Sequence, residues 1–138
     1  MKKFVVILTL ILGLLSGVAS AQTDPRDQSP VVVFAAQATT ATSDAYAVIS
    51  SAAGEAVWFH VTGTGITGDY TVEGTLDAEA TVKAGTAVWF TLSTGSTLPT
   101  AVALTNTMPY VRVKVTRTAG TFRVLMRGSG GTRFRKVE

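Results

Sequence analysis

Few side chains in this sequence have the chemistry that catalysis requires. His60 is the only histidine, and the chain contains no cysteine. A zinc site of the usual kind needs several histidine or cysteine ligands, and a lone histidine has no second group to orient it as a base. In the segment AVWFHVT, strand alternation puts His60 on one face with Trp58 and Thr62. We therefore expect no catalytic residues and no enzymatic activity.

Two further patterns resemble cofactor or metal sites only in their spacing. Gly63-x-Gly65-x-x-Gly68 has the letters of a dinucleotide-binding loop, but such a loop must open a helix whose N-terminus holds the pyrophosphate. Strands are expected on both sides here, which indicates a glycine-rich hairpin loop. Calcium needs several oxygen ligands from one compact loop, and the chain offers only scattered acids: Asp69, Glu73, Asp77 and Glu79. We predict neither a cofactor nor a metal site.

Charged residues are segregated along the chain. Residues 22–110 contain two bases and eight acids (2 − 8 = −6), whereas residues 111–138 contain eight bases and one acid (8 − 1 = +7). The two sets either neutralise each other within one molecule, meet between subunits, or leave a basic surface that holds a polyanion. The candidate polyanion or partner site is made of the bases expected on the outer face of two C-terminal strands: Arg112, Lys114, Arg123 and Arg127.

Two tryptophans are candidates for stacking on a sugar ring. Trp58 and Trp89 each stand in a Val-Trp-Phe triplet, at residues 57–59 and 88–90. Their aromatic neighbours favour the alternative, in which they belong to the core together with other large side chains: Phe59, Tyr70, Phe90 and Phe122. Nucleic-acid binding is not expected, because the basic residues are not interleaved with exposed aromatic side chains.

The N-terminus has the pattern of an export signal. Two lysines precede an apolar run of 12 residues from Phe4 to Leu15, and Ala19-Ser20-Ala21 is the small-x-small motif of a cleavage site. A membrane-spanning helix needs about 20 apolar residues, so no stable membrane anchor is expected. We predict a cleavable signal peptide helix over 1–21 and a mature chain beginning at Gln22. The protein should then reach the periplasm, the extracellular space, or a cell or virion surface.

The mature chain has the composition of a β protein. Residues 22–30 are polar and contain two prolines, which predicts a flexible arm. The later chain has short Val- and Thr-rich segments between Gly, Ser, Asn and Pro, which indicates antiparallel strands. The expected strands are 31–36, 45–50, 56–62, 69–76, 86–92, 102–105, 111–116 and 121–127.

The last two of these strands are expected to form a hairpin through a turn at 117–120. Seven to eight short strands in one domain, residues 31–128, predict an all-β fold: an antiparallel, jelly-roll-like β-sandwich. Residues 129–138 are rich in bases and begin with Gly-Ser-Gly-Gly, which predicts a flexible basic tail.

Residues 68–128 also have an order of motifs found elsewhere. GDYTVEGTLD is followed by AVWFTL, MPYVRVKVT and TFRVLMRG. This order resembles β-sandwich modules of phage virion-associated proteins and discoidin-like surface-binding domains, although the Asp-Gly turn of those modules is absent here. The resemblance implies a non-enzymatic structural or attachment role.

Together these observations predict an exported, non-catalytic structural or adhesive module at a cell, matrix or virion surface. Its acidic and basic faces would allow it to self-associate or to bind a surface protein. The alternative is a secreted module that binds a carbohydrate or a polyanion.

Overall fold

The computed structural model of the chain describes residues 29–49, 55–105 and 108–138. The signal peptide predicted over 1–21 lies outside the described residues, as does most of the arm predicted over 22–30. Within the described ranges, no helix has the length and apolar character needed to cross a membrane.

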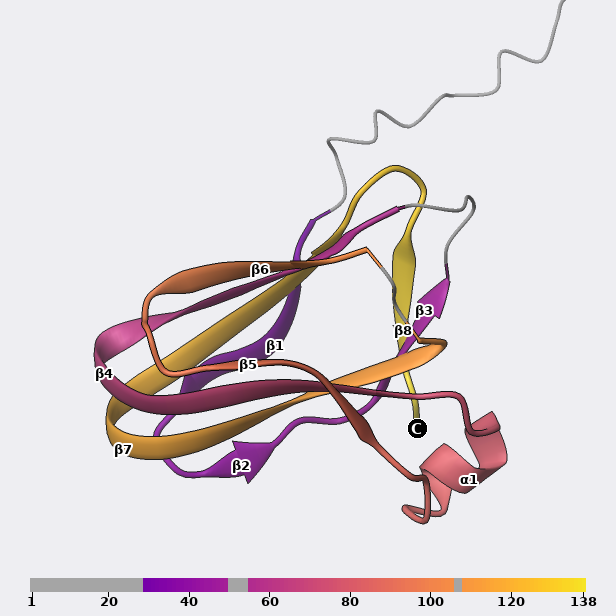
Figure 1. The fold of residues 1–138 in the computed structure, drawn as a ribbon, viewed down its shortest axis with the longest axis horizontal. Helices are drawn as coiled ribbons and strands as arrows, with labels where there is room; N and C mark the ends of the chain where they lie inside the picture. The colour runs from indigo at the N-terminus through magenta and orange to yellow at the C-terminus, as the bar shows by residue number, and fades with distance from the viewer. Residues whose placement is uncertain (1–28, 50–54, 106–107) are drawn as a thin grey trace, which may run out of the picture.

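The described chain is mostly β-structure (Figure 1). Its eight strands form one antiparallel sheet, and one short helix lies at one end of the molecule. The elements are β1 (Val31–Gln37), β2 (Ala41–Thr42), β3 (Tyr46–Ile49), β4 (Val57–Thr75), α1 (Glu79–Lys83), β5 (Phe90–Gly95), β6 (Thr100–Leu104), β7 (Tyr110–Gly128) and β8 (Arg133–Lys136).

Two strands of 19 residues each, β4 and β7, form the centre of the sheet. They pair along their whole length, from Val57 opposite Gly128 to Thr75 opposite Tyr110. The other strands attach to one half or the other: β6 and β5 to the two halves of β4, and β1, β2 and β3 to successive parts of β7. Strand β8 completes the sheet by pairing with β3.

These long strands correct two predictions. The segments 56–62 and 69–76, expected as separate strands, are the two halves of β4. The hairpin predicted for 111–116 and 121–127 is also wrong, because both segments belong to the one strand β7 and each pairs with β4 rather than with the other. The glycine-containing segments 63–68 and 117–120 resemble turns in the sequence. In the structure they are the place where β4 and β7 bend together, at the left of Figure 1.

The bend is built from two β-bulges that compensate each other. The pairing passes from Thr64 opposite Thr121 to Thr67 opposite Ala119, and then to Gly68 opposite Arg117. The first step gives β4 one extra residue and the second gives β7 one extra residue, so the original register returns. Each strand, however, has shifted its alternation by one position.

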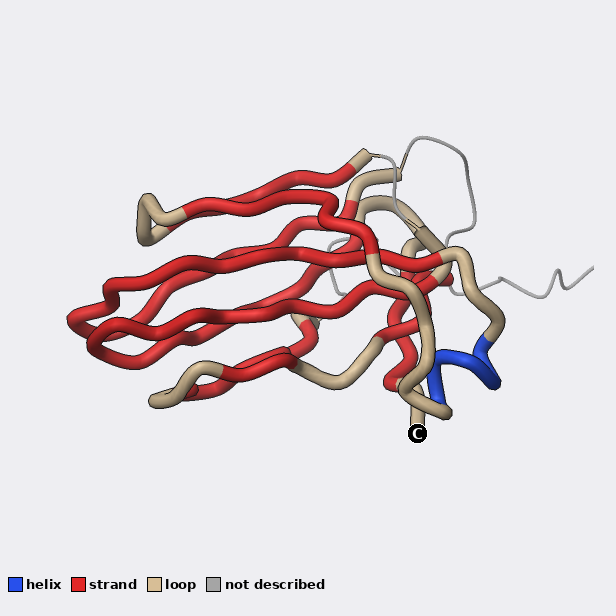
Figure 2. The backbone as a smooth tube through the Cα atoms, turned by 60° about the horizontal axis from the view of Figure 1, so that its bottom comes forward, coloured by secondary structure: helices blue, strands red, loops and turns tan. Residues whose placement is uncertain are grey.

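The burial pattern follows this shift. In β4 the buried apolar residues are odd-numbered before the bend (Val57, Phe59, Val61) and even-numbered after it (Tyr70, Val72). In β7 they are odd-numbered before the bend and even-numbered after it: Val111, Val113, Val115, Phe122, Val124 and Met126. All of these side chains belong to one hydrophobic cluster. The bulges therefore keep the same side of the sheet turned inward in both halves, and Figure 2 shows the curved backbone of the strands.

The glycines of the Gly63-x-Gly65-x-x-Gly68 pattern serve this bend. A Cβ atom on Gly63 would overlap the carbonyl oxygen of Thr121, and one on Gly68 would overlap that of Thr116. Gly120 approaches the backbone of Gly65 in the same way and has a positive φ of 70°. The pattern is thus neither a nucleotide loop nor the hairpin loop we expected, but a site where two backbones must come close.

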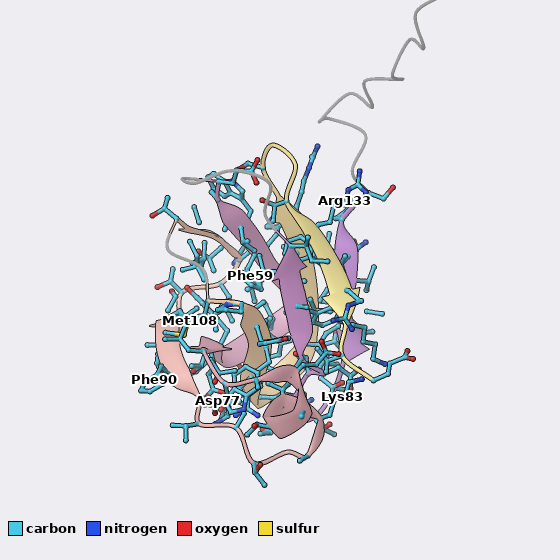
Figure 3. All side chains as sticks on the ribbon, turned by 90° about the vertical axis from the view of Figure 1, so that its right-hand side faces the viewer. Phe59, Asp77, Lys83, Phe90, Met108 and Arg133 are labelled. Atoms are coloured by element: carbon cyan, nitrogen blue, oxygen red, sulfur yellow. The ribbon has the colours of Figure 1, made fainter. Side chains whose placement is uncertain are left out.

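The predicted core is correct for some aromatic residues and wrong for others. Phe59 and Phe122 are fully buried, and Tyr70 is 6% exposed. In contrast, Trp58 is 47% exposed and Phe90 is 52% exposed. Trp58 is adjacent to Phe59 in a strand, so the two side chains point to opposite faces and only one can enter the core. Figure 3 places Phe59 among the strands and Phe90 at the margin of the molecule.

The C-terminal segment 129–138 is not the flexible tail that its composition predicted. Residues 133–136 form β8, and the turn before it is held by Glu55. The Glu55 carboxylate accepts hydrogen bonds from the backbone N–H of Gly131 (2.7 Å) and the hydroxyl of Thr132 (2.6 Å). Because Thr132 is 1% exposed, this turn forms part of the folded structure and the domain extends beyond residue 128.

The bend predicts a strong effect for a very small substitution. Gly63→Ala should lower the free energy of unfolding by about 2 kcal/mol or more, because a methyl group has no room beside the Thr121 carbonyl. The neighbouring Thr64 is exposed, so Thr64→Ala should change it by about 0.5 kcal/mol or less. Urea denaturation of both variants measures the difference, and equal midpoints would show that the close approach is not required.

Candidate binding face

The four bases predicted as one binding site lie in two different environments. Arg112 and Lys114 are on the first half of β7, before the bend, and Arg123 and Arg127 are on the second half. By alternation all four point away from the core, but the strands beside them differ. The first pair faces the end of β4 that carries Glu73, and the second pair faces the part that carries Trp58 and Thr62.

Arg112, Lys114, Glu73 and Trp89 form a compact group that we call the Arg112 cluster. Glu73 lies directly opposite Arg112 in the register and accepts a hydrogen bond from its Nε at 2.6 Å. The Lys114 ammonium lies 3.6 Å from the other carboxylate oxygen. The Arg112 guanidinium also lies over the Trp89 ring, 4.1 Å from its centre, which is a cation–π contact.

This cluster unites residues that the sequence had suggested for different ligands. Arg112 was a candidate for binding a polyanion and Trp89 for stacking on a glycan. In the structure the two side chains contact each other instead, because the Arg112 guanidinium lies over the Trp89 ring. The Glu73 side chain is only 11% exposed, so its ion pair with Arg112 is better shielded from water than a surface pair. The geometry of the Arg112 cluster is that of a structural contact between β4, β7 and the segment directly before β5.

The ion pairs also bear on the segregation of charge along the chain. Of the five ion pairs among the described residues, four join an acid that precedes residue 110 to a base that follows it. These four are Glu73–Arg112, Glu73–Lys114, Glu79–Arg135 and Asp44–Lys136. For these residues, the acidic and basic parts of the sequence meet within one molecule.

The second pair of bases belongs to an outward surface that we call the Trp58 face. Its side chains come from four adjacent strands, and the register aligns them in rows. One row runs Ala103–Trp58–Arg127, the next Ala101–His60–Leu125–Val32, and a third joins Thr62 to Arg123. The Trp58 face therefore consists of Val32, Trp58, His60, Thr62, Ala101, Ala103, Arg123, Leu125 and Arg127.

The Trp58 face combines exposed apolar surface with positive charge. Trp58 is 47% exposed and Val32 is 51% exposed, although apolar side chains of this size are more often inside. On the β6 side, the register partner of Trp58 is Ala103, whose side chain is small. The strand segments that build the face, 31–37, 57–63, 100–104 and 121–128, contain no aspartate or glutamate.

The face also sets the surroundings of His60. In its row His60 lies between Ala101 and Leu125, whose side chains have no hydrogen-bonding atoms. Its nearest neighbours along β4 on the same face are Trp58 and Thr62. None of these side chains is a carboxylate that could orient the imidazole as a base.

The structure does not assemble the acids once considered for calcium. Asp77 accepts a hydrogen bond from the backbone N–H of Val88 at 2.7 Å, Glu73 belongs to the Arg112 cluster, and Glu79 pairs with Arg135 and Lys83. Among the described residues, no three acidic or histidine side chains come close enough together to hold a metal ion.

Sequence reasoning missed the partners that make Trp58 part of a surface. The local sequence around Val32, Ala101 and Ala103 does not indicate a binding surface. These residues belong to the Trp58 face only because of which strands lie beside β4 and β7. A stricter use of alternation at Trp58 and Phe59 would have shown that the two cannot share the core. It could not have shown which of them is exposed.

The pairing of Glu79 predicts a dependence of stability on pH. The Arg135 guanidinium hydrogen-bonds to the Glu79 carboxylate at 2.6 and 3.1 Å, and this contact, followed by that of Lys83, lowers the pKa of Glu79 from 4.5 to about 2. The charged carboxylate thus stabilises the folded state above about pH 4.5, and this contribution disappears as the pH falls toward 2.

Glu79→Gln should accordingly be less stable than the wild type at pH 6 and equal to it near pH 2, as read from urea midpoints. Asp69→Asn is the control for the loss of one negative charge, because Asp69 belongs to none of the ion pairs between described residues. A Glu79→Gln deficit of the same size at both pH values would contradict the assignment.

Comparisons with known proteins identify no relative of this chain. No protein-family model matches the chain, and searches of the curated proteins and of the solved structures find no match. The resemblance of residues 68–128 to virion-associated and discoidin-like modules is tested by none of these comparisons and stays a prediction. What the protein does must therefore be inferred from the residues of its own surface.

Proposed function

We propose that the protein is an exported, non-catalytic module that attaches to a cell, matrix or virion surface through the Trp58 face and has a structural or adhesive role. The observation that carries this proposal is the exposure of Trp58 and Val32 on the same side of the sheet as two arginines. Exposed apolar side chains gathered in this way are typical of an interaction surface.

The fold supports such a role. Both halves of the bent sheet contribute to one cluster, and we interpret them as the two layers of a jelly-roll-like β-sandwich. A rigid sheet holds side chains at fixed spacing and loses little conformational entropy when they bind. The Trp58 face has this property, because all of its residues lie on strands.

Self-association through acidic and basic faces has weaker support. The ion pairs within the molecule already engage Glu73, Glu79 and Asp44, so these acids are not available to a second copy without breaking existing contacts. The alternative of a secreted carbohydrate- or polyanion-binding module uses the same face as surface attachment, and the exposed Trp58 ring specifically favours it.

Export is tested by the N-terminus of the mature protein. Protein recovered from outside the cytoplasm should begin at Gln22, as measured by intact mass and N-terminal sequencing. A variant with Ala19→Arg and Ala21→Arg should keep the N-terminal segment, because a signal peptidase requires small residues there. Recovery of the uncleaved wild-type chain in the cytoplasm alone would refute the export proposal.

Attachment is tested with a pair of exposed aromatic residues. Fluorescently labelled wild-type protein should adhere to cells or matrix of its own source, and Trp58→Ser should weaken adherence by about tenfold or more, a loss of about 1.4 kcal/mol. Phe90→Ser is the matched control, because Phe90 is equally exposed but lies outside the Trp58 face. If Trp58→Ser adheres as well as the wild type does, attachment does not use this face.

A further inference from the structure

We infer that the ligand of the Trp58 face is an acidic glycan, a chain of pyranose rings that carry carboxylate or sulfate groups. This inference rests on the proposed attachment function and names the chemistry that the face would recognise. It depends on three properties of the face: its aromatic platform, its charge and its dimensions.

The aromatic platform is suited to a sugar ring. A pyranose presents an apolar face of C–H groups, which packs well against an indole that offers large apolar area at little entropic cost. Trp58 is nearly half exposed and stands beside Ala103 and Ala101 of the edge strand β6, so a ring can approach it from that side. Trp89 does not offer the same platform, because the Arg112 guanidinium lies over its ring.

The charge of the face selects an anionic ligand. Arg127 lies opposite Trp58, and Arg123 lies opposite Thr62, while no carboxylate occurs in the strand segments that form the face. Guanidinium groups bind carboxylate and sulfate oxygens through charge-assisted hydrogen bonds. Arg123 differs in this respect from Arg112 and Lys114: these two bases pair with Glu73, whereas Arg123 belongs to none of the ion pairs between described residues.

The dimensions fit an extended chain rather than a single ring. Trp58 and Thr62 are four residues apart on one strand, which corresponds to about 13 Å. Arg123, beside Thr62, is therefore displaced along the sheet from the ring that would stack on Trp58. An acidic group on a neighbouring sugar of the same chain would reach Arg123, with the Thr62 hydroxyl and His60 between them as hydrogen-bonding groups.

The same observations argue against two other occupants. A second copy bound face to face would place Arg123 and Arg127 near their own counterparts, and like charges repel. A single-stranded nucleic acid is also anionic, but proteins that hold it use several aromatic side chains in succession along a strongly basic groove. The Trp58 face has one exposed tryptophan and two arginines.

The test compares acidic glycans with matched neutral ones. The probes are oligogalacturonate, the same oligomer as its methyl ester, a sulfated heparin oligosaccharide, neutral dextran oligomers and single-stranded DNA, each titrated by calorimetry. We expect at least one of the two acidic glycans to bind at least tenfold more tightly than its neutral counterpart. Raising the salt concentration should weaken that binding, because screening acts on charged contacts at a surface.

Variants locate the binding on the face. Trp58→Ser and Arg123→Gln should each weaken binding of the acidic glycan by about tenfold. Lys114→Gln removes the same charge from the Arg112 cluster, and Phe90→Ser removes an exposed aromatic ring elsewhere, so both should bind like the wild type. In a Trp89→Phe background, Trp58 is the sole tryptophan, and its fluorescence should shift when the glycan binds. Thermal unfolding confirms that each variant is folded.

The outcomes separate the ligand from the attachment function. The inference is overturned if neither acidic glycan binds more tightly than its neutral counterpart, or if DNA binds more tightly than both acidic glycans, even if Trp58→Ser still loses adherence to its surface. In that case attachment through the face would survive with a ligand of another class. Full adherence of Trp58→Ser would instead refute the attachment proposal itself.

Discussion

The close approach of β4 and β7 at their common bend is the constraint on which the other features depend. Glycines at 63, 68 and 120 allow the two backbones to meet where any side chain would collide, and the two compensating bulges restore the register beyond that point. Without this shift, residues such as Phe59 and Val72 could not face the same interior. The bend therefore determines which side chains form the core and which remain available on the surface.

The surface chemistry follows from the register of the same two strands. Arg112 meets Glu73 and Arg127 meets Trp58 because both pairs share one register across the bend. The first pairing produces an ion pair between two strands, and the second places an arginine beside an exposed tryptophan. Bases that look equivalent in the sequence thus acquire different roles, and a net charge for the whole chain says little about either.

How much of this could be predicted from the sequence depends on the range of the interactions. The β class and the segments 31–36 and 111–116 could be recognised, since valine-rich alternation is a local signal. The continuity of β7 could not, because Arg117–Gly120 resembles a turn and becomes a bend only through Gly63 and Gly68, which are distant in the sequence. The Trp58 face was partly foreseen through Trp58 and the bases, but its membership depends on strand neighbours that no local pattern specifies.

The order of strands in the sheet has a consequence for how the molecule is made. Strand β7 pairs with β1, β2, β3 and β4, and β8 and the turn that Glu55 holds come later still. A ribosome therefore delivers β7 only after all four of its partner strands, and most native pairings form between distant parts of the chain. Chains of such high contact order fold slowly. The sheet accordingly cannot close until β7 has been made and has paired with β4 along its length.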